Sequence, residues 1–170
     1  MKLEMNLQGL DGVLATLRSL PPEVVSKRGG PVKLALAKGA RVIRDEARRN
    51  LERVTSTPGK TGINYGTGFS PRQLIVRRRP MPGGQNGERY VLTVRPATHP
   101  NGNVYRRGKR IAANDVTFML EYGTANQPAE PWLRPAFEAK KEQAMAVVIQ
   151  DLKRRVDLVV AKLAAQNKGR

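Results

Sequence analysis

The sequence predicts a single α+β domain: a mainly antiparallel sheet of about four strands, packed by a long helix in the N-terminal half and a long C-terminal helix. Apolar residues recur three or four positions apart over 32–54 and again up to about residue 164, which predicts the two helices. Shorter stretches predict strands, and the expected order of elements is β-α-α-β-β-β-α. A chain of 170 residues can bury the core of one such domain, expected over residues 1–165.

The first half of the chain begins with Leu3, Met5 and Leu7, which alternate with polar residues and predict a strand over 2–7. A short helix follows and ends at Pro21. The helix over 32–54 has one apolar stripe, made of Leu36, Ala40, Ile43, Ala47, Leu51 and Val54. Its other side carries Arg41, Arg44, Arg48, Arg49 and Arg53, so we expect a strongly basic exposed face.

The middle of the chain predicts two strands between long loops. Residues 55–72 are rich in Thr, Ser, Gly and Pro, and we expect a loop there. Strands are predicted at 73–79 and 88–95, joined by a hairpin connection that contains the turn pair Asn86-Gly87. A second polar loop is expected over 96–114.

A further strand is predicted at 116–122, because alternation puts four apolar residues on one face: Val116, Phe118, Leu120 and Tyr122. The last helix is expected from Pro131 or Trp132 to Ala164, with residues 166–170 as a frayed tail. Its apolar stripe consists of Leu133, Phe137, Ala144, Val148, Leu152, Val156, Val159 and Leu163. Such a helix is on the order of 45 Å long. We therefore expect its C-terminal part to leave the domain and pack on a neighbour.

The balance of charge is strongly basic, with 31 Lys and Arg against 14 Asp and Glu and a formal net charge of +17. A charge of this size favours anionic partners, namely nucleic acid, an anionic membrane surface or acidic protein surfaces. A solvated basic surface that only aids solubility is the alternative. No apolar run approaches the roughly 18 residues of a membrane span, so we expect no membrane-spanning segment. Of the three kinds of anionic partner, a membrane is not among those we expect. The absence of Cys excludes a disulfide framework and a thiolate metal site.

Catalytic arrangements are hard to build from these residues. His99 is the only His, and no Gly-x-Ser-x-Gly motif surrounds a Ser, for which Ser70 is a poor substitute. The carboxylates Asp45 and Glu46 lie among arginines of one helix, where ion pairs explain them. Gly59-Lys60-Thr61 lacks the first Gly of a P-loop. We therefore expect neither an enzyme nor a cofactor or metal site.

Two neighbouring segments carry the most informative pattern. They are Phe118-Met119-Leu120-Glu121-Tyr122-Gly123-Thr124 and Pro128-Ala129-Glu130-Pro131-Trp132-Leu133-Arg134-Pro135-Ala136-Phe137. Their residue types suggest a strand, a Gly turn, a loop with prolines and the start of a helix. This pattern resembles that of small neck and tail-completion proteins of long-tailed bacteriophages. Lys60-Thr61-Gly62-Ile63, after the first long helix, is similar to a loop in the same family.

The resemblance implies a structural protein of the virion rather than an enzyme. Such a protein forms a ring, commonly a hexamer, at the head–tail junction, where it completes or terminates the tail tube and enables joining to the capsid. The implied partners are copies of the chain itself, the tail tube protein and the head-completion or connector proteins. Assembly takes place in the host cytoplasm, and non-specific contact with packaged DNA is possible.

Site residues follow from the same resemblance. Glu121, Tyr122, Gly123 and Thr124 are expected to shape the exit from the strand, with Gly123 allowing a tight turn. Apart from the resemblance, Glu121 is expected to form a structural pair with Arg134 rather than to act as a catalytic acid. The residues expected to fix the start of the last helix against the sheet are Pro128, Pro131, Trp132, Leu133, Arg134, Pro135 and Phe137. We expect this motif to build the fold rather than to contact the next subunit.

Basic clusters are the expected electrostatic contacts, either with other subunits or with DNA. They are Arg77, Arg78, Arg79, Arg106, Arg107, Lys109 and Arg110. Such clusters can bind phosphates without reading base sequence, so a non-specific nucleic-acid-binding protein is the alternative function. Aromatic residues are only 5% of the chain and do not interleave with the strand arginines, which argues against a base-stacking platform.

Overall fold

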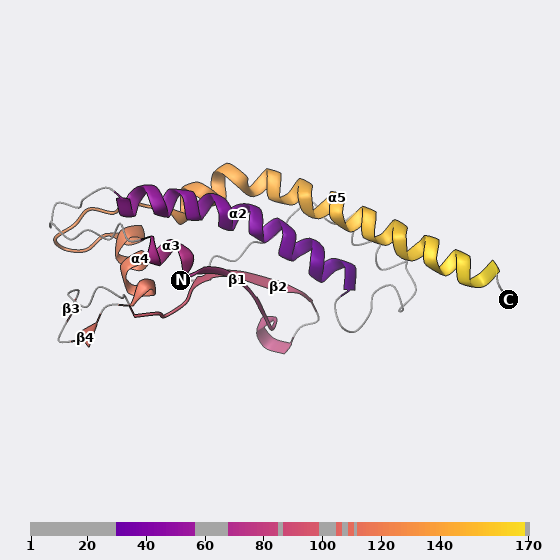
Figure 1. The fold of residues 1–170 in the computed structure, drawn as a ribbon, viewed down its shortest axis with the longest axis horizontal. Coiled ribbons are helices and arrows are strands. Elements are labelled where there is room, and N and C mark those ends of the chain that lie inside the picture. The colour runs from indigo at the N-terminus through magenta and orange to yellow at the C-terminus, as the bar shows by residue number, and fades with distance from the viewer. Residues whose placement is uncertain are drawn as a thin grey trace.

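The computed structural model describes residues 30–56, 68–84, 87–98, 105–106, 109–110 and 112–168 (Figure 1). Its helices are α2 (Gly30–Ser56), α3 (Phe69–Arg72), α4 (Ala113–Tyr122) and α5 (Leu133–Lys168), with the 3-10 turn η1 (Pro82–Gly84). Its strands are β1 (Leu74–Arg79), β2 (Arg89–Val94), β3 (Tyr105–Arg106) and β4 (Lys109–Arg110). The strand predicted over 2–7 and the short helix after it lie outside the described residues.

The two long helices predicted from the sequence are confirmed, and they lie side by side and antiparallel (Figure 1). In α2 the buried residues include Ala40, Ile43, Ala47 and Leu51, which belong to the predicted stripe. In α5 the predicted stripe supplies Leu133, Ala144, Val148 and Leu152 as buried residues. Burial of these two stripes against each other forms most of the core, together with Leu74 of β1 and Leu92 of β2.

A glycine brings α2 and α5 unusually close. A Cβ atom placed on Gly39 would lie 2.3 Å from Val148 Cγ2 and 2.9 Å from the Ala144 carbonyl oxygen. Distances this short leave no room for any side chain at position 39 unless α5 shifts. Glycine in the middle of a helix ordinarily destabilises it relative to alanine, so here close packing outweighs helix propensity.

The predicted hairpin is confirmed as the antiparallel pair β1–β2, in which Leu74 lies opposite Val94 and Arg79 opposite Arg89. Its inner residues pack against α2, because Leu74 and Leu92 are buried in the same core as Ile43 and Leu51. The connection contains η1, where Gly83 has φ 66° and so adopts the left-handed conformation that glycine tolerates best.

The predicted strand at 116–122 is wrong, because these residues belong to helix α4. Positions 116 and 120 are apolar in both patterns, since a separation of four residues fits two steps of strand alternation and one helical turn. The structure buries Val116, Thr117, Leu120 and Glu121. Phe118 and Tyr122, which the strand would have placed on the same face, are 52% and 50% exposed.

The predicted sheet of about four strands is also wrong. The described residues form one two-stranded sheet, β1–β2, and a separate pair of two-residue strands, β3–β4, so helices dominate the fold. The conversion of 116–122 into a helix removes one expected strand. Of the expected loops, 55–72 contains the short helix α3 and 96–114 contains β3, β4 and the start of α4, and their remaining residues are described only in part.

The C-terminal helix extends beyond its neighbour. Val156 is the last α5 residue that packs with the apolar residues at the start of α2, including Val32 and Leu36. From there α5 continues to Lys168, past the Gly30 end of α2 and into the segment expected to fray (Figure 1). We call residues 157–168 the α5 extension; within it Leu158 is 61% and Val160 48% exposed. No helix in the described part of the chain is long and apolar enough to span a membrane.

An ion-pair cluster joins the two helices near this end. The buried carboxylate of Asp151 in α5 accepts hydrogen bonds from Lys38 Nζ of α2, at 2.9 Å, and from Arg155 Nε one turn further along α5. These hydrogen bonds, from Lys38 first and Arg155 second, hold the pKa of Asp151 below its ordinary value of 3.8. The ionised form of Asp151 is therefore favoured by the folded state.

Gly39→Ala should lower the free energy of unfolding by about 1–3 kcal/mol, because the added methyl group overpacks the contact with α5. Urea denaturation of the purified protein measures this change. Val148→Ala in the same chain should restore part of the loss, since it removes the nearer of the two clashing groups. An alanine at position 39 that stabilises the protein, as helix propensity alone predicts, would contradict the close approach.

Asp151→Asn should destabilise the protein at neutral pH by an amount that disappears in acid. Since the folded-state pKa is lowered, the contribution of Asp151 is fully present above about pH 4 and is lost as the pH falls through the folded-state value. Melting temperatures of wild type and variant, measured at a series of pH values, should therefore converge below about pH 4. Asp157→Asn, on an exposed residue of the same helix, is the matched control and should leave the profile unchanged. A difference for Asp151→Asn that stays constant with pH would contradict this assignment.

Candidate functional site

Two regions contain the residues that the sequence singles out. The first is the corner between α4 and α5, which holds the segments with phage-protein resemblance. Gly123 ends α4 with φ 75°, and a Cβ atom there would lie 2.8 Å from the backbone nitrogen of Ala129. Glycine is therefore required at this turn, as expected. The chain then reverses at Thr124, whose N–H donates to the Gln127 carbonyl at 2.8 Å.

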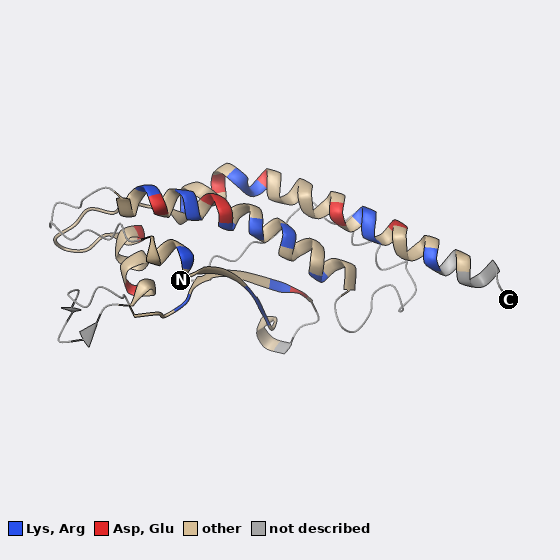
Figure 2. Ribbon diagram, in the orientation of Figure 1, with Lys and Arg blue, Asp and Glu red and all other residues tan. Residues whose placement is uncertain are grey.

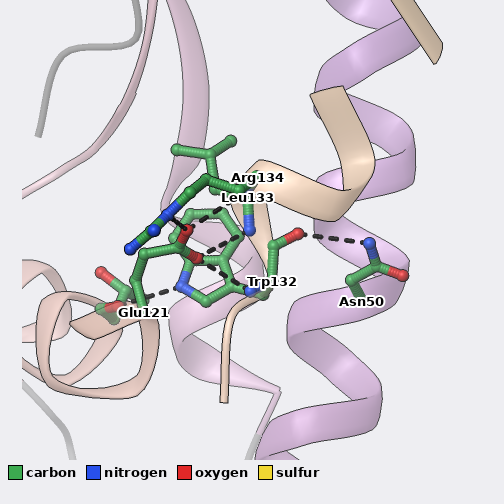
Figure 3. A network of polar contacts seen from close by, with 6 residues as sticks. Asn50, Glu121, Trp132, Leu133 and Arg134 are labelled. Carbon is green, nitrogen blue, oxygen red and sulfur yellow. Dashed lines mark hydrogen bonds and ion pairs between the residues drawn. The ribbon is translucent and has the colours of Figure 1, made fainter. Parts of the chain in front are cut away.

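A single buried carboxylate organises this corner. Glu121 is fully buried, and its Oε2 accepts hydrogen bonds from the backbone N–H groups of Trp132 and Leu133, both at 2.8 Å (Figure 3). Its Oε1 accepts from the backbone N–H of Arg134 at 3.2 Å and from the Arg134 side chain at 3.1 Å. The predicted pair between Glu121 and Arg134 is thus confirmed, and the carboxylate also caps α5.

The hydrogen bonds of the α5 N-terminus can be accounted for in full. A helix leaves its first four N–H groups without acceptors in the helix itself. At the start of α5 these positions are Trp132, Leu133, Arg134 and Pro135; Glu121 accepts from the first three, and proline has no N–H. Pro135 lies inside the first turn, where its missing N–H costs nothing. The negative charge of Glu121 also faces the positive end of the helix dipole.

Trp132 ties this corner to two other helices. Its side chain is fully buried, and its indole Nε1 donates to the Thr117 carbonyl of α4 at 3.0 Å. Its own carbonyl accepts a hydrogen bond from Asn50 Nδ2 of α2 at 3.2 Å (Figure 3). The polar contacts of the motif therefore reach α4 and α2, whereas we expected it to fix the last helix against the sheet. Trp132 and Leu133 share the apolar core with Leu74 of β1 and Leu92 of β2.

The remaining motif residues lie around this buried centre. The exposed guanidinium of Arg134 is 5.0 Å from the ring centroid of Tyr122, which in turn lies 4.8 Å from the ring of Phe118. Phe137 is partly buried and packs on the core. The others, Thr124, Pro128, Pro131 and Pro135, are exposed. The corner is thus a folding element whose outer surface is an aromatic and cationic patch.

The second region is a groove of about 590 Å³ between α2 and the β1–β2 hairpin. Of its lining residues eight are basic and none is acidic: Lys33, Arg41, Arg44, Arg48, Arg72, Arg77, Arg78 and Arg95. Its remaining lining residues are Leu34, Ala37, Leu74, Ile75, Val76 and Tyr90. We call this the basic groove. Figure 2 shows Lys and Arg along α2 and on the hairpin that faces it.

The sequence predicted only part of this surface. Arg77 and Arg78 lie in the basic groove, whereas Arg79 is exposed at the end of β1 and is not among its lining residues. The backbones of Arg106, Lys109 and Arg110 form the β3–β4 pair, and Arg107 lies outside the described residues. The sequence pattern puts Arg41, Arg44 and Arg48 on the exposed side of a helix, but their spacing alone does not show that a strand lies opposite.

Several arginines of the basic groove have structural roles. Arg48 donates to the carbonyls of Pro71 and Leu74, at 3.2 and 3.3 Å, and Arg44 pairs with Asp45 at 2.6 Å. Arg78 makes two hydrogen bonds to Glu88, which raise its pKa. Arg41, Arg77 and Arg95 make no ion pair with any residue that the structure describes. Their charges are available to an anionic ligand.

Residues considered for catalysis offer no reactive arrangement in the described segments. Asp45 and Glu46 pair with Arg44 and Arg49, which confirms that ion pairs account for them. Ser70 is fully buried, and its Oγ has no hydrogen-bond partner among the described residues. His99 lies outside them. The described segments contain no cluster of His, Asp and Glu suited to a metal ion.

Glu121→Ala should lower the free energy of unfolding by about 3 kcal/mol or more, because it leaves buried N–H groups at the α5 N-terminus without acceptors. Arg134→Ala is the matched control. Its side chain is 59% exposed, so loss of this ion pair should cost only about 0.5 kcal/mol. Urea denaturation of both variants measures the difference. Equal losses would mean that the surface ion pair, and not the buried cap, is the important interaction.

Comparisons of the chain with protein-family models, with curated proteins and with solved structures find no match. The resemblance of residues 118–137, and of the loop at 60–63, to phage neck proteins therefore stays a prediction from the sequence.

Proposed function

We propose that this chain is a structural subunit of the head–tail junction of a long-tailed bacteriophage. It assembles with copies of itself into a ring that completes or terminates the tail tube and enables joining to the capsid. Its proposed partners are the tail tube protein and the head-completion or connector proteins, with non-specific contact to packaged DNA. Two observations support this: the resemblance of residues 118–137, and the shape of the molecule.

The α5 extension is the observation that carries the proposal. It projects past α2 with Leu158 and Val160 exposed on different sides of the helix, where each is available for contact with a neighbouring subunit. Phe118 and Tyr122 on α4 form a second exposed apolar surface. Figure 1 places α4 and the C-terminal end of α5 at opposite ends of the molecule. Two different surfaces at opposite ends suit head-to-tail contacts, which generate rings when the rotation closes.

The motif acts indirectly in this proposal. Glu121 and Trp132 are fully buried, so they cannot contact a neighbouring subunit in the folded protein. They instead fix the corner from which α5 starts and thereby orient its extension. Exposed residues around the corner, including Tyr122 and Arg134, are available for contact with a neighbour.

A second candidate function is non-specific nucleic-acid binding, which the basic groove and the net charge of +17 favour. Binding of this kind depends on phosphate contacts, so affinity for DNA would fall steeply as salt concentration rises. Assembly through apolar residues of the α5 extension would persist at the same salt concentrations.

The proposal predicts the phenotype of a phage that carries an early nonsense codon in this reading frame. Electron microscopy of its particles should show filled heads beside unattached tails, since the junction cannot form. Abnormal tail length would assign termination to the protein, and normal length would assign joining. Intact, infectious virions would exclude the structural role and favour nucleic-acid binding.

Complementation of the same phage from a plasmid tests the α5 extension directly. The wild-type chain should restore infectious particles, whereas Leu158→Ser with Val160→Ser should not, because the exposed apolar contact is lost. Lys153→Ser with Lys162→Ser, on exposed polar positions of α5, is the matched control and should complement. Equal complementation by both double variants would show that assembly does not require the apolar residues of the α5 extension.

A further inference from the structure

The basic groove combines charge with an unpaired strand edge. Five of its lining residues come from β1, Leu74 to Arg78, whereas only Tyr90 comes from β2 and Arg95 directly follows that strand. In the described residues β1 pairs with β2 alone, so its other edge is open. An open edge presents backbone N–H and C=O groups that can pair with another chain.

The hydrogen-bond pattern shows which backbone groups face outward. Arg95 N donates to the Gln73 carbonyl at 3.0 Å, so the pair formed by these two residues is a hydrogen-bonded pair of the ladder. In an antiparallel ladder such pairs alternate with pairs that make no hydrogen bonds to each other. With the observed register, Leu74, Val76 and Arg78 therefore direct their backbone groups away from β2.

One of these outward groups is already in use, and it shows that the edge faces α2. The Leu74 carbonyl accepts a hydrogen bond from Arg48 of α2. The outward backbone groups of Val76 and Arg78 have no hydrogen-bond partner in the described part of the chain. The backbone N–H and C=O groups of these two residues could therefore pair with a short extended segment.

The helix opposite this edge presents a line of cations. Lys33, Arg41, Arg44 and Arg48 lie on one side of α2 at helical spacing, with Ala37 between the first two, and all of them line the basic groove. A segment paired with β1 would have alternate side chains on one face of its strand. Acidic side chains at those positions could reach the unpaired Arg41 from the strand, while Arg77 and Arg95 extend the positive surface on the hairpin.

We propose that the basic groove binds an extended acidic segment of a partner protein, which adds to β1 as a third strand. Main-chain hydrogen bonds to Val76 and Arg78 provide the pairing, and the arginines select acidic side chains. The inference deepens the proposed function, on which it rests, by giving the chemistry of one partner of the junction. A second copy of this chain fits less well, because its few acidic residues are dispersed along a sequence of net charge +17. DNA fits the charge but has no peptide groups to pair with a strand edge.

Fluorescence anisotropy with the purified full chain tests this proposal. The probe is a fluorescein-labelled peptide of alternating Glu and Val, long enough to pair with all of β1. The groove variant is R41E/R77E/R95E, which changes three groove cations that make no ion pair with any residue in the described segments. Its matched control is K153E/R154E/K162E, with the same change of charge on exposed positions of α5. The groove variant should lose roughly ten-fold or more in affinity and the control less than about two-fold.

Two modified peptides test the strand pairing without altering the protein. One carries N-methyl groups on all Glu residues and the other on all Val residues. Since alternate residues of a strand face its partner, one of these peptides should lose binding and the other should retain it. Binding by both, or by neither, would overturn the added strand.

A single-stranded oligonucleotide of equal charge completes the test. If it binds more tightly than the peptide and only the groove variant weakens it, the basic groove is a nucleic-acid site and the proposal is wrong. Equal losses for the groove and control variants would show that net charge alone attracts the peptide, which also overturns it. A failure here leaves the particle phenotype unaffected, because that experiment does not depend on this groove.

Discussion

The carboxylate of Glu121 is the constraint on which the rest of this structure depends. It lies fully buried near the end of α4 and accepts from three successive backbone N–H groups at the start of α5. A buried charge is costly unless it is fully hydrogen-bonded, so the two helices must keep one relative arrangement for this group to be tolerated. Trp132 adds contacts to both α4 and α2. The direction of the longest helix is thus fixed by side chains from three elements.

Acidic residues are scarce in this protein, and several of them are used inside it. Glu121 caps α5, Asp151 forms an ion pair that links α5 to α2, and Glu88 forms an ion pair with Arg78. Since these carboxylates neutralise cations within the fold, the remaining excess of Lys and Arg is left at the surface. In the basic groove this excess lies beside an edge of β1 that pairs with no other strand among the described residues. Part of the excess positive charge is therefore concentrated on one surface of the fold, which the composition alone does not show.

The sequence predicted the elements whose patterns extend over many residues. The stripes of α2 and α5 and the β1–β2 hairpin were predicted nearly to their ends. The failure at α4 arose because Val116 and Leu120 fit helical and strand spacing equally well over so short a segment. The ion pair of Glu121 and Arg134 was predicted from the charges of these residues. The capping by Glu121 was not, because no local spacing shows that a side chain will accept from N–H groups a turn and a loop away. The basic groove likewise depends on a strand and a helix that only the tertiary fold brings together.

The α5 helix is held at points spread along its length: Trp132 near its start, the close contact of Gly39 with Ala144 and Val148, and Asp151 further on. Because these contacts are spread along α5, the orientation of the helix does not depend on any one of them alone. Residues 157–168 continue the same helix for ~18 Å beyond Val156, the last apolar contact with α2 in the described residues, at about 1.5 Å per residue. The buried corner formed by Glu121 and Trp132, together with the contacts along α5, therefore determines the position of the α5 extension at the other end of the molecule.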